Sequence, residues 1–178
     1  MPVDLQETQP LALICAIMAG SKTLMTETRS KLEARLGPVR QASAAYDFGF
    51  TSYYAGEMGE GLIKQLLCFT ELVDPAVLPN VKLQTMELER QMGQEKEGEI
   101  HRRANIDPGL VSIESLVLAT TKYSGHRICI GPSLFAEVTL LYQKGVYRPM
   151  EWTYPDYRSR EVQDFLQEVR THLMAKRS

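Results

Sequence analysis

Three side chains suited to acid–base chemistry lie in the second half of the chain, namely Asp107, His126 and Glu137. A histidine beside a carboxylate can act as a general base or contribute to a metal site. The same residues could equally form a hydrogen-bonded pair on a partly hydrated sheet face, without any reaction. We therefore treat the three as candidate catalytic residues of a hydrolase or transferase, in which Glu137 orients the His126 base.

A predicted hairpin with its loop at residues 131–133 decides whether this pair can meet. If the loop pairs Ile130 with Phe135, His126 and Glu137 become diagonal neighbours on one face of the sheet. A slip of one residue would place them on opposite faces, because side chains alternate along a strand. The chemistry thus depends on the register of a single hairpin.

A second group of side chains could hold an anionic ligand against that sheet face: Arg102, Asn105 and Lys122. The guanidinium fork matches the oxygens of a phosphate or a carboxylate. The alternative is ordinary surface charge together with an Asx turn at Asn105. We expect a small anionic ligand, nucleotide-like ligands included, near residues 105–158.

An aromatic segment near the end of the chain holds Trp152, Tyr154, Tyr157 and Arg158. Aromatic rings and an arginine plane can stack on a base or another ring. Aromatic side chains in a loop that contains proline also commonly cover a hydrophobic core. Both interpretations stay open for this segment.

The spacing of the residues argues against two common kinds of site. A phosphate-binding loop needs Gly-x-x-x-x-Gly-Lys-Ser/Thr after a strand, but here Cys15 replaces the first glycine, and Ser21 separates Gly20 from Lys22. No Asn-Lys-x-Asp sequence is present to recognise guanine. No closely spaced histidine motif predicts a metal site either, so we assign no metal, and the cofactor stays unknown.

The elements that must position these residues follow from hydrophobic periodicity and turn residues. Strands are predicted at residues 11–19, 39–50, 62–73, 110–113, 126–130, 134–142 and 146–148, and helices after Ser21, after Asp74, at 115–122 and from Ser159. Asp107-Pro108-Gly109 predicts a tight turn. Residues 94–104 are charged and predict a mobile loop, and residues 1–10 a flexible terminus.

This order of elements predicts one α+β domain over residues 1–178. We expect a mostly antiparallel sheet covered on one face by about three helices, as a single pair of layers. The last helix has Val162, Phe165, Leu166, Val169 and Leu173 on one stripe, the pattern of a helix packed on a core.

Composition narrows the class of protein. The net charge of −2 gives no reason to expect nucleic acid or an anionic membrane as a partner. The apolar run at residues 11–19 is too short to cross a bilayer and lacks a basic flank. Three cysteines without a Cys-x-x-Cys pair predict reduced thiols in a cytoplasmic protein.

Residues 105–158, together with Phe48, Tyr53-Tyr54 and Glu57-Met58-Gly59, closely resemble a family of small prokaryotic proteins, domain of unknown function 4416. The resemblance covers almost the whole chain and implies a stand-alone, single-domain prokaryotic protein. It implies no reaction, cofactor or catalytic residue. Some relatives carry a label of GTP-binding protein, which the missing motifs do not support.

Three functions therefore stay open at this level. The first is the binding of a small anionic molecule, and the second is a hydrolase or transferase that uses His126 with Glu137. The third is an interaction module without enzymatic activity, which an apolar outer face on the last helix would favour. The sequence leaves the oligomeric state undetermined.

Overall fold

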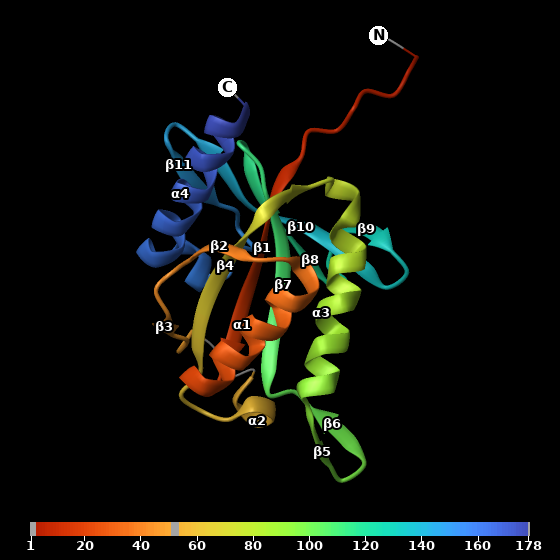
Figure 1. Cartoon of the computed structure of the whole chain (residues 1–178), viewed down its shortest axis with the longest axis vertical. Coiled ribbons are helices and arrows are strands. Elements are labelled where there is room, and N and C mark those ends of the chain that lie inside the picture. The colour runs from red at the N-terminus through yellow and green to blue at the C-terminus, as the bar shows by residue number, and fades with distance from the viewer. Residues whose placement is uncertain (1–2, 51–53, 178) are drawn as a thin grey trace.

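The protein is built on a nine-stranded sheet, shown in Figure 1, and a computed structural model describes residues 3–50 and 54–177. The elements are, in chain order, β1 (Leu11–Ala19), α1 (Lys22–Leu36), β2 (Val39–Ala42), β3 (Tyr46–Asp47), α2 (Ala55–Met58), β4 (Ile63–Val73), the 3-10 turn η1 (Pro75–Val77), α3 (Leu78–Met92), β5 (Gln94–Lys96), β6 (Glu99–His101), β7 (Ala104–Val111), β8 (Ser115–Thr120), β9 (Ile128–Gly131), β10 (Leu134–Gln143), β11 (Val146–Pro149), the 3-10 turn η2 (Pro155–Arg158) and α4 (Arg160–Arg177).

Every strand pairing in the described part of this sheet is antiparallel, and the order is β11-β10-β8-β7-β1-β4-β2. The four strands β7-β1-β4-β2, with α1 and α3 as their crossovers, follow the order of a split βαβ, ferredoxin-like unit. The strands β8, β10 and β11 extend this unit beyond β7. The predicted α+β class with an antiparallel sheet is thus confirmed.

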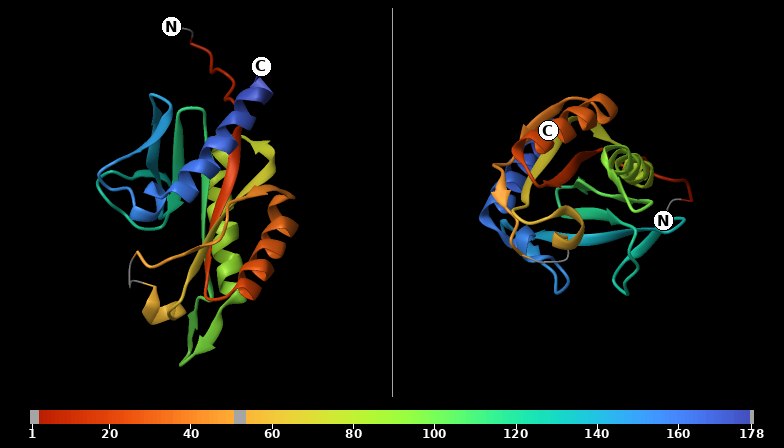
Figure 2. Two further views of the ribbon diagram at one scale, coloured as in Figure 1. Left: turned by 90° about the vertical axis from the view of Figure 1, so that its left-hand side faces the viewer. Right: turned by 90° about the horizontal axis from the view of Figure 1, so that it is seen from below.

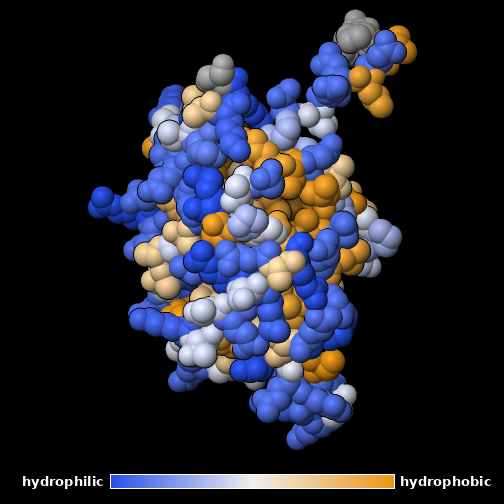
Figure 3. All heavy atoms as spheres, in the orientation of Figure 1, coloured by the Kyte–Doolittle hydropathy of each residue, from blue (hydrophilic) through white to orange (hydrophobic). Residues whose placement is uncertain are grey.

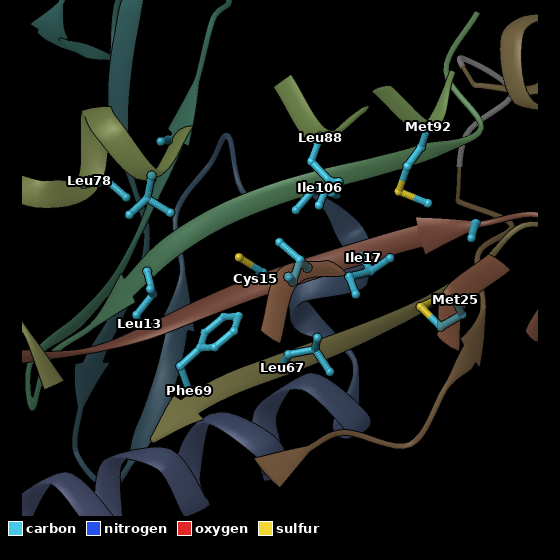
Figure 4. Packing of buried hydrophobic residues seen from close by; sticks show 14 of the residues in the cluster. Leu13, Cys15, Ile17, Met25, Leu67, Phe69, Leu78, Leu88, Met92 and Ile106 are labelled. Atoms are coloured by element: carbon cyan, nitrogen blue, oxygen red, sulfur yellow. The ribbon is translucent and has the colours of Figure 1, made fainter. Parts of the chain in front are cut away.

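The placement of the helices differs from the prediction, because α1 and α3 pack on one face of the sheet and α4 packs on the other (Figure 2). Leu13, Cys15 and Ile17 of β1 pack with α1 and α3, as Figure 4 shows, whereas Ile14 and Ala16 pack with α4. A strand that is buried on both faces needs apolar residues at every position. This explains why β1 reads as one unbroken apolar run.

The ends and inner faces of the helices follow the sequence closely. Ser21 Oγ accepts a hydrogen bond from Leu24 N–H at the start of α1, and Gly37 ends that helix with a φ of 92°. The predicted stripe on α4 is buried at all five positions, from Val162 to Leu173. Consistently, the surface in Figure 3 is mostly hydrophilic, with an apolar area near the upper end of α3.

The predicted turn at Asp107-Pro108-Gly109 is wrong, because these residues lie inside β7. Ile106 directs its N–H and C=O away from β1, toward side chains of α3, and Pro108 lies two residues further along the strand. Backbone groups two residues apart point to the same edge of a strand, so Pro108 lacks an N–H at the edge that faces away from β1. No strand in the described part of the chain pairs with β7 along that edge here, and the proline therefore breaks no hydrogen bond between strands. The strand β8 pairs with β7 only from Gly109 onward.

Two further segments differ from expectation. Residues 115–122 were expected to be helical, but β8 forms there because β7 and β10 pair with its two edges. The charged segment after α3 forms the hairpin of β5 and β6 instead of a loop. Positive φ angles at Glu97 (52°) and Gly98 (81°) give the two-residue turn that a hairpin favours. Its mobility stays a prediction.

Candidate functional site

A cavity of about 120 Å³ opens on the sheet face that carries α4, beyond the first turn of that helix. Its walls come from five strands (β1, β4, β7, β8 and β10), from α3 and η2, and from the loop before α2. The charged and aromatic lining consists of five cationic side chains, three acidic ones and four aromatic rings: Lys64, Lys82, Arg102, Lys122, Arg127, Asp107, Glu137, Asp156, Phe48, Tyr54, Tyr154 and Tyr157.

The expected pair of His126 and Glu137 is in contact at the β9–β10 hairpin. His126 Nε2 lies 2.8 Å from Glu137 Oε2, and Arg127 Nε donates to the same oxygen at 2.8 Å. Ser124 Oγ lies 3.1 Å from His126 Nδ1, so both ring nitrogens are engaged. A carboxylate only accepts, so Nε2 carries a proton, and in the neutral imidazole Nδ1 then accepts from Ser124.

The register that brings the pair together is not the predicted one. Phe135 lies opposite Cys129 rather than Ile130, because the ladder is irregular between Leu134 and Phe135. His126 precedes β9 and sits in a turn, where Arg127 N–H donates to Ser124 C=O at 3.0 Å. The turn, rather than the strand pairing, returns the imidazole to Glu137.

The ring of His126 is held by Trp152. Their centroids are 4.6 Å apart with planes inclined by 12°, and Trp152 Nε1 donates to the Val138 carbonyl at 2.9 Å. Trp152 and Arg158 are absent from the cavity lining, whereas Tyr154 and Tyr157 belong to it. The Arg158 guanidinium donates to the carbonyls of Met150 and Thr153, which ties the aromatic segment together. Of the four candidate stacking residues, two therefore line the cavity, and the other two contact His126 and the backbone of the aromatic segment.

Asp107 lies on β7 in a separate hydrogen-bond network. Asn105 Nδ2 donates to Asp107 Oδ2 at 2.7 Å, and Lys82 Nζ lies 3.4 Å from Asp107 Oδ1. Burial opposes ionisation of this carboxyl, but the Lys82 and Lys64 ammonium groups, together with the hydrogen bonds from Asn105 and Lys82, hold its pKa below the ordinary value. Asp107 thus shares the cavity with Glu137, while its carboxylate is engaged by Asn105 and Lys82.

Arg102 lines the cavity, but its fork is already occupied. Its Nε and one terminal nitrogen donate to Glu57 at 3.0 and 2.7 Å, and its other terminal nitrogen donates to Asn105 Oδ1 at 2.9 Å. The hydrogen bonds to Glu57 raise the pKa of Arg102 further above its ordinary value and lower that of Glu57. Arg102 therefore holds α2 against β7, while Lys122 lines the same cavity.

Lys64 and Asp156 are site residues that the sequence did not single out. Lys64 Nζ lies 2.5 Å from Asp156 Oδ2, and both side chains are almost fully buried. The same ammonium lies 4.5 Å from the centre of the Tyr157 ring and 5.2 Å from that of Phe48. The only available signal was a lysine in the middle of an apolar strand, because 92 residues separate it from its partner.

No group of three or more histidine, cysteine, aspartate or glutamate side chains in residues 3–50 and 54–177 is arranged to hold a metal ion. No helix in the same part of the chain is both long and apolar enough to cross a bilayer.

Comparison with known proteins agrees with the sequence motifs. Residues 9–172 match the family described as Domain of unknown function (DUF4416). Neither the curated proteins nor the solved structures gave a match. The match spans nearly all of the 178 residues, including every strand of the cavity wall, and the chain therefore belongs to this family.

Proposed function

We propose that this protein binds a small anionic ligand in the cavity between the sheet and the aromatic segment. The observation that carries the proposal is the lining, in which five cationic side chains face three acidic ones beside four aromatic rings. Buried cations next to aromatic faces are a suitable surface for a phosphate or a carboxylate carried on a small body.

The volume bounds the ligand. One water molecule needs about 10–15 Å³ of cavity volume. A cavity of about 120 Å³ therefore holds a ligand of roughly ten non-hydrogen atoms. This suits a phosphate ester of a three-carbon unit or a short dicarboxylate. A nucleotide-like ligand would extend outward past Tyr154, which is 49% exposed.

Calorimetric titration and a thermal-shift series with inorganic phosphate, glycerol 3-phosphate and malonate test the proposal. A ligand that binds only the folded protein raises its melting temperature. The Lys122→Gln variant, which removes one cation from the lining, should bind more weakly, whereas Lys144→Gln in the β10–β11 turn should bind as the wild type does. Wild-type protein that binds none of the three probes would contradict the proposal.

A hydrolase is the second candidate function, and it is favoured by the chain of contacts from Ser124 through His126 to Glu137. In this mechanism Ser124 Oγ attacks an ester carbonyl and His126 Nδ1 accepts its proton. The imidazolium then returns that proton to the leaving alcohol, and water releases the acyl group from Ser124. In the binding function, the same contacts simply orient Glu137 toward the cavity.

A fluorophosphonate probe separates these two roles, because it labels only an activated serine. Labelling that maps to Ser124 and disappears in both Ser124→Ala and His126→Ala would establish the nucleophile. A folded wild-type protein that stays unlabelled, and that hydrolyses no p-nitrophenyl ester faster than Ser124→Ala, would rule it out.

We also propose that the protein works in a prokaryotic cytoplasm. The support is the three free thiols, of which Cys129 is exposed, since an exposed free thiol persists best in a reducing compartment. Fractionation of cells that produce the tagged protein would test this, and a periplasmic signal would overturn it.

A further inference from the structure

Tyr157 carries a hydrogen-bonding group that the folded chain leaves unused. The residue is 2% exposed, and among the described residues its hydroxyl has no hydrogen-bond partner. The same residue lines the cavity. Buried polar groups nearly always have a partner, so an orphan hydroxyl on a cavity wall indicates that the cavity's occupant supplies one.

The hydroxyl keeps its proton at neutral pH and is therefore able to donate a hydrogen bond to such an occupant. Burial, together with the nearby Asp156 and Asp107 carboxylates, holds the pKa of Tyr157 well above its ordinary value. The group therefore stays an uncharged O–H, which can donate its proton to a hydrogen-bond acceptor on the ligand.

Lys64 provides the charge beside this donor. Its ammonium lies 4.5 Å from the centre of the Tyr157 ring, and it lines the same cavity. An ammonium has three N–H donors, more than the single oxygen of Asp156 can satisfy. Since cations outnumber acids in the lining, an anionic acceptor fits this position better than a neutral one.

We propose that Tyr157 and Lys64 form an oxyanion subsite, in which the Tyr157 hydroxyl and the Lys64 ammonium donate to one phosphate or carboxylate group of the ligand. This inference rests on the proposed function and assigns its recognition step to one wall of the cavity. The remaining space then accommodates the body of the ligand next to the Tyr54 and Tyr154 rings.

A tyrosine that binds the ligand and a tyrosine with only a structural role should respond differently to the loss of the hydroxyl. Replacing Tyr157 by Phe removes an unsatisfied hydroxyl while keeping the ring, so the melting temperature of the ligand-free protein should stay equal or rise. Affinity for the ligand should nevertheless fall, because a hydrogen bond to a charged group is lost.

Tyr147 supplies a matched control. It is also buried, at 3% exposure, and its hydroxyl also has no partner among the described residues, but it does not line the cavity. Its ring packs edge-on against Tyr142 and belongs to the core cluster that α4 covers. Tyr147→Phe therefore makes the same chemical change at a site where no ligand is expected.

The experiment is isothermal titration of wild type, Tyr157→Phe and Tyr147→Phe with inorganic phosphate, glycerol 3-phosphate and malonate, alongside melting curves of the free proteins. We expect Tyr157→Phe to lose about ten- to hundred-fold in affinity without any loss of melting temperature, and Tyr147→Phe to bind as the wild type does. Tighter binding of glycerol 3-phosphate than of malonate would identify the oxyanion as a phosphate, and the reverse order as a carboxylate.

The possible failures can be told apart. If wild type and Tyr157→Phe bind a probe equally well, the subsite is wrong while the proposed function stands. If the wild type binds none of the probes, both are wrong. An equal loss of affinity in the two variants would show a general effect on the core and would overturn the subsite as well.

Discussion

The carboxylate of Glu89 on α3 accepts a hydrogen bond from the backbone N–H of Ile106 on β7, with a distance of 2.5 Å. Lys82, two turns earlier on the same helix, donates from Nζ to the carbonyl of Ile106 at 3.2 Å. Two side chains of a helix thus satisfy a stretch of β7 that β8 does not cover. Lys82 and Glu89 reach this edge of β7 from α3, which packs on the face of the sheet opposite to α4. They satisfy the backbone of Ile106 without a further strand.

This arrangement predicts a pH-dependent stability. Burial raises the pKa of Glu89 from an ordinary 4.5 to about 7, although Lys82 and the Ile106 N–H favour the ionised form. A raised folded-state pKa contributes stability that is complete below pH 4.5 and is lost as the pH rises through 7. Glu89→Gln should lack this loss. As the pH rises from acidic to mildly alkaline, its free energy of unfolding should therefore increase by up to about 3 kcal/mol relative to that of the wild type.

Urea unfolding of both proteins at several pH values measures the difference. Glu87→Gln is the matched control, because Glu87 lies on the same helix with a side chain that is 46% exposed. Parallel stability curves for wild type and Glu89→Gln would show that the buried carboxyl does not titrate in this range.

The buried pair of Lys64 and Asp156 predicts a large cost for removing one partner. Lys64→Met leaves the Asp156 carboxylate uncompensated at 1% exposure and should destabilise the protein by about 3–5 kcal/mol. The double variant Lys64→Met/Asp156→Leu should recover most of that loss. Arg160→Ala, which breaks the exposed pair with Asp164, should change the free energy of unfolding by less than about 1 kcal/mol. Equal effects of the buried and the exposed replacements would refute this ranking.

Gly109 predicts a steric effect where β7 meets β8. A Cβ atom there would lie 2.6 Å from Leu118 Cδ2 and 2.7 Å from the backbone oxygen of Val117. Because that oxygen belongs to a paired strand and cannot move aside, Gly109→Ala should cost about 2–3 kcal/mol in a denaturant titration. Gly125→Ala has no heavy atom within 4 Å of the new Cβ and should be close to neutral. A neutral Gly109→Ala would mean that the two strands can separate.

The cysteines predict a selective reaction with thiol reagents. Burial raises the pKa of Cys15 and Cys68, so both stay protonated and shielded, whereas Cys129 is exposed. One thiol should react quickly with Ellman's reagent in the native protein, and all three after unfolding in urea. Cys129→Ser should abolish the fast phase, and a fast phase that persists in this variant would place a second thiol at the surface.

Local sequence patterns were sufficient to predict the structure wherever the decisive contacts are made by residues close together in the chain. The apolar run of β1, the Ser21 cap and the buried stripe of α4 each follow from spacing within one element. The contact of His126 with Glu137 could be anticipated for the same reason, since a short hairpin joins the two residues. Its register was wrong by one residue on the β9 side, because an irregularity in a ladder has no clear signal in the sequence.

Tertiary structure decided the rest, because the deciding partners are far away along the chain. Asp107-Pro108-Gly109 has strong turn residues, but pairing with β1 and the support from α3 hold it extended. Lys64 and Asp156 are 92 residues apart, and only folding shows that they form one wall of a cavity. The sequence alone determined many of the elements and one local pair of polar residues. The cavity, its excess of cations and the orphan hydroxyl of Tyr157 exist only where distant strands and the η2 turn converge, and no local periodicity encodes that convergence.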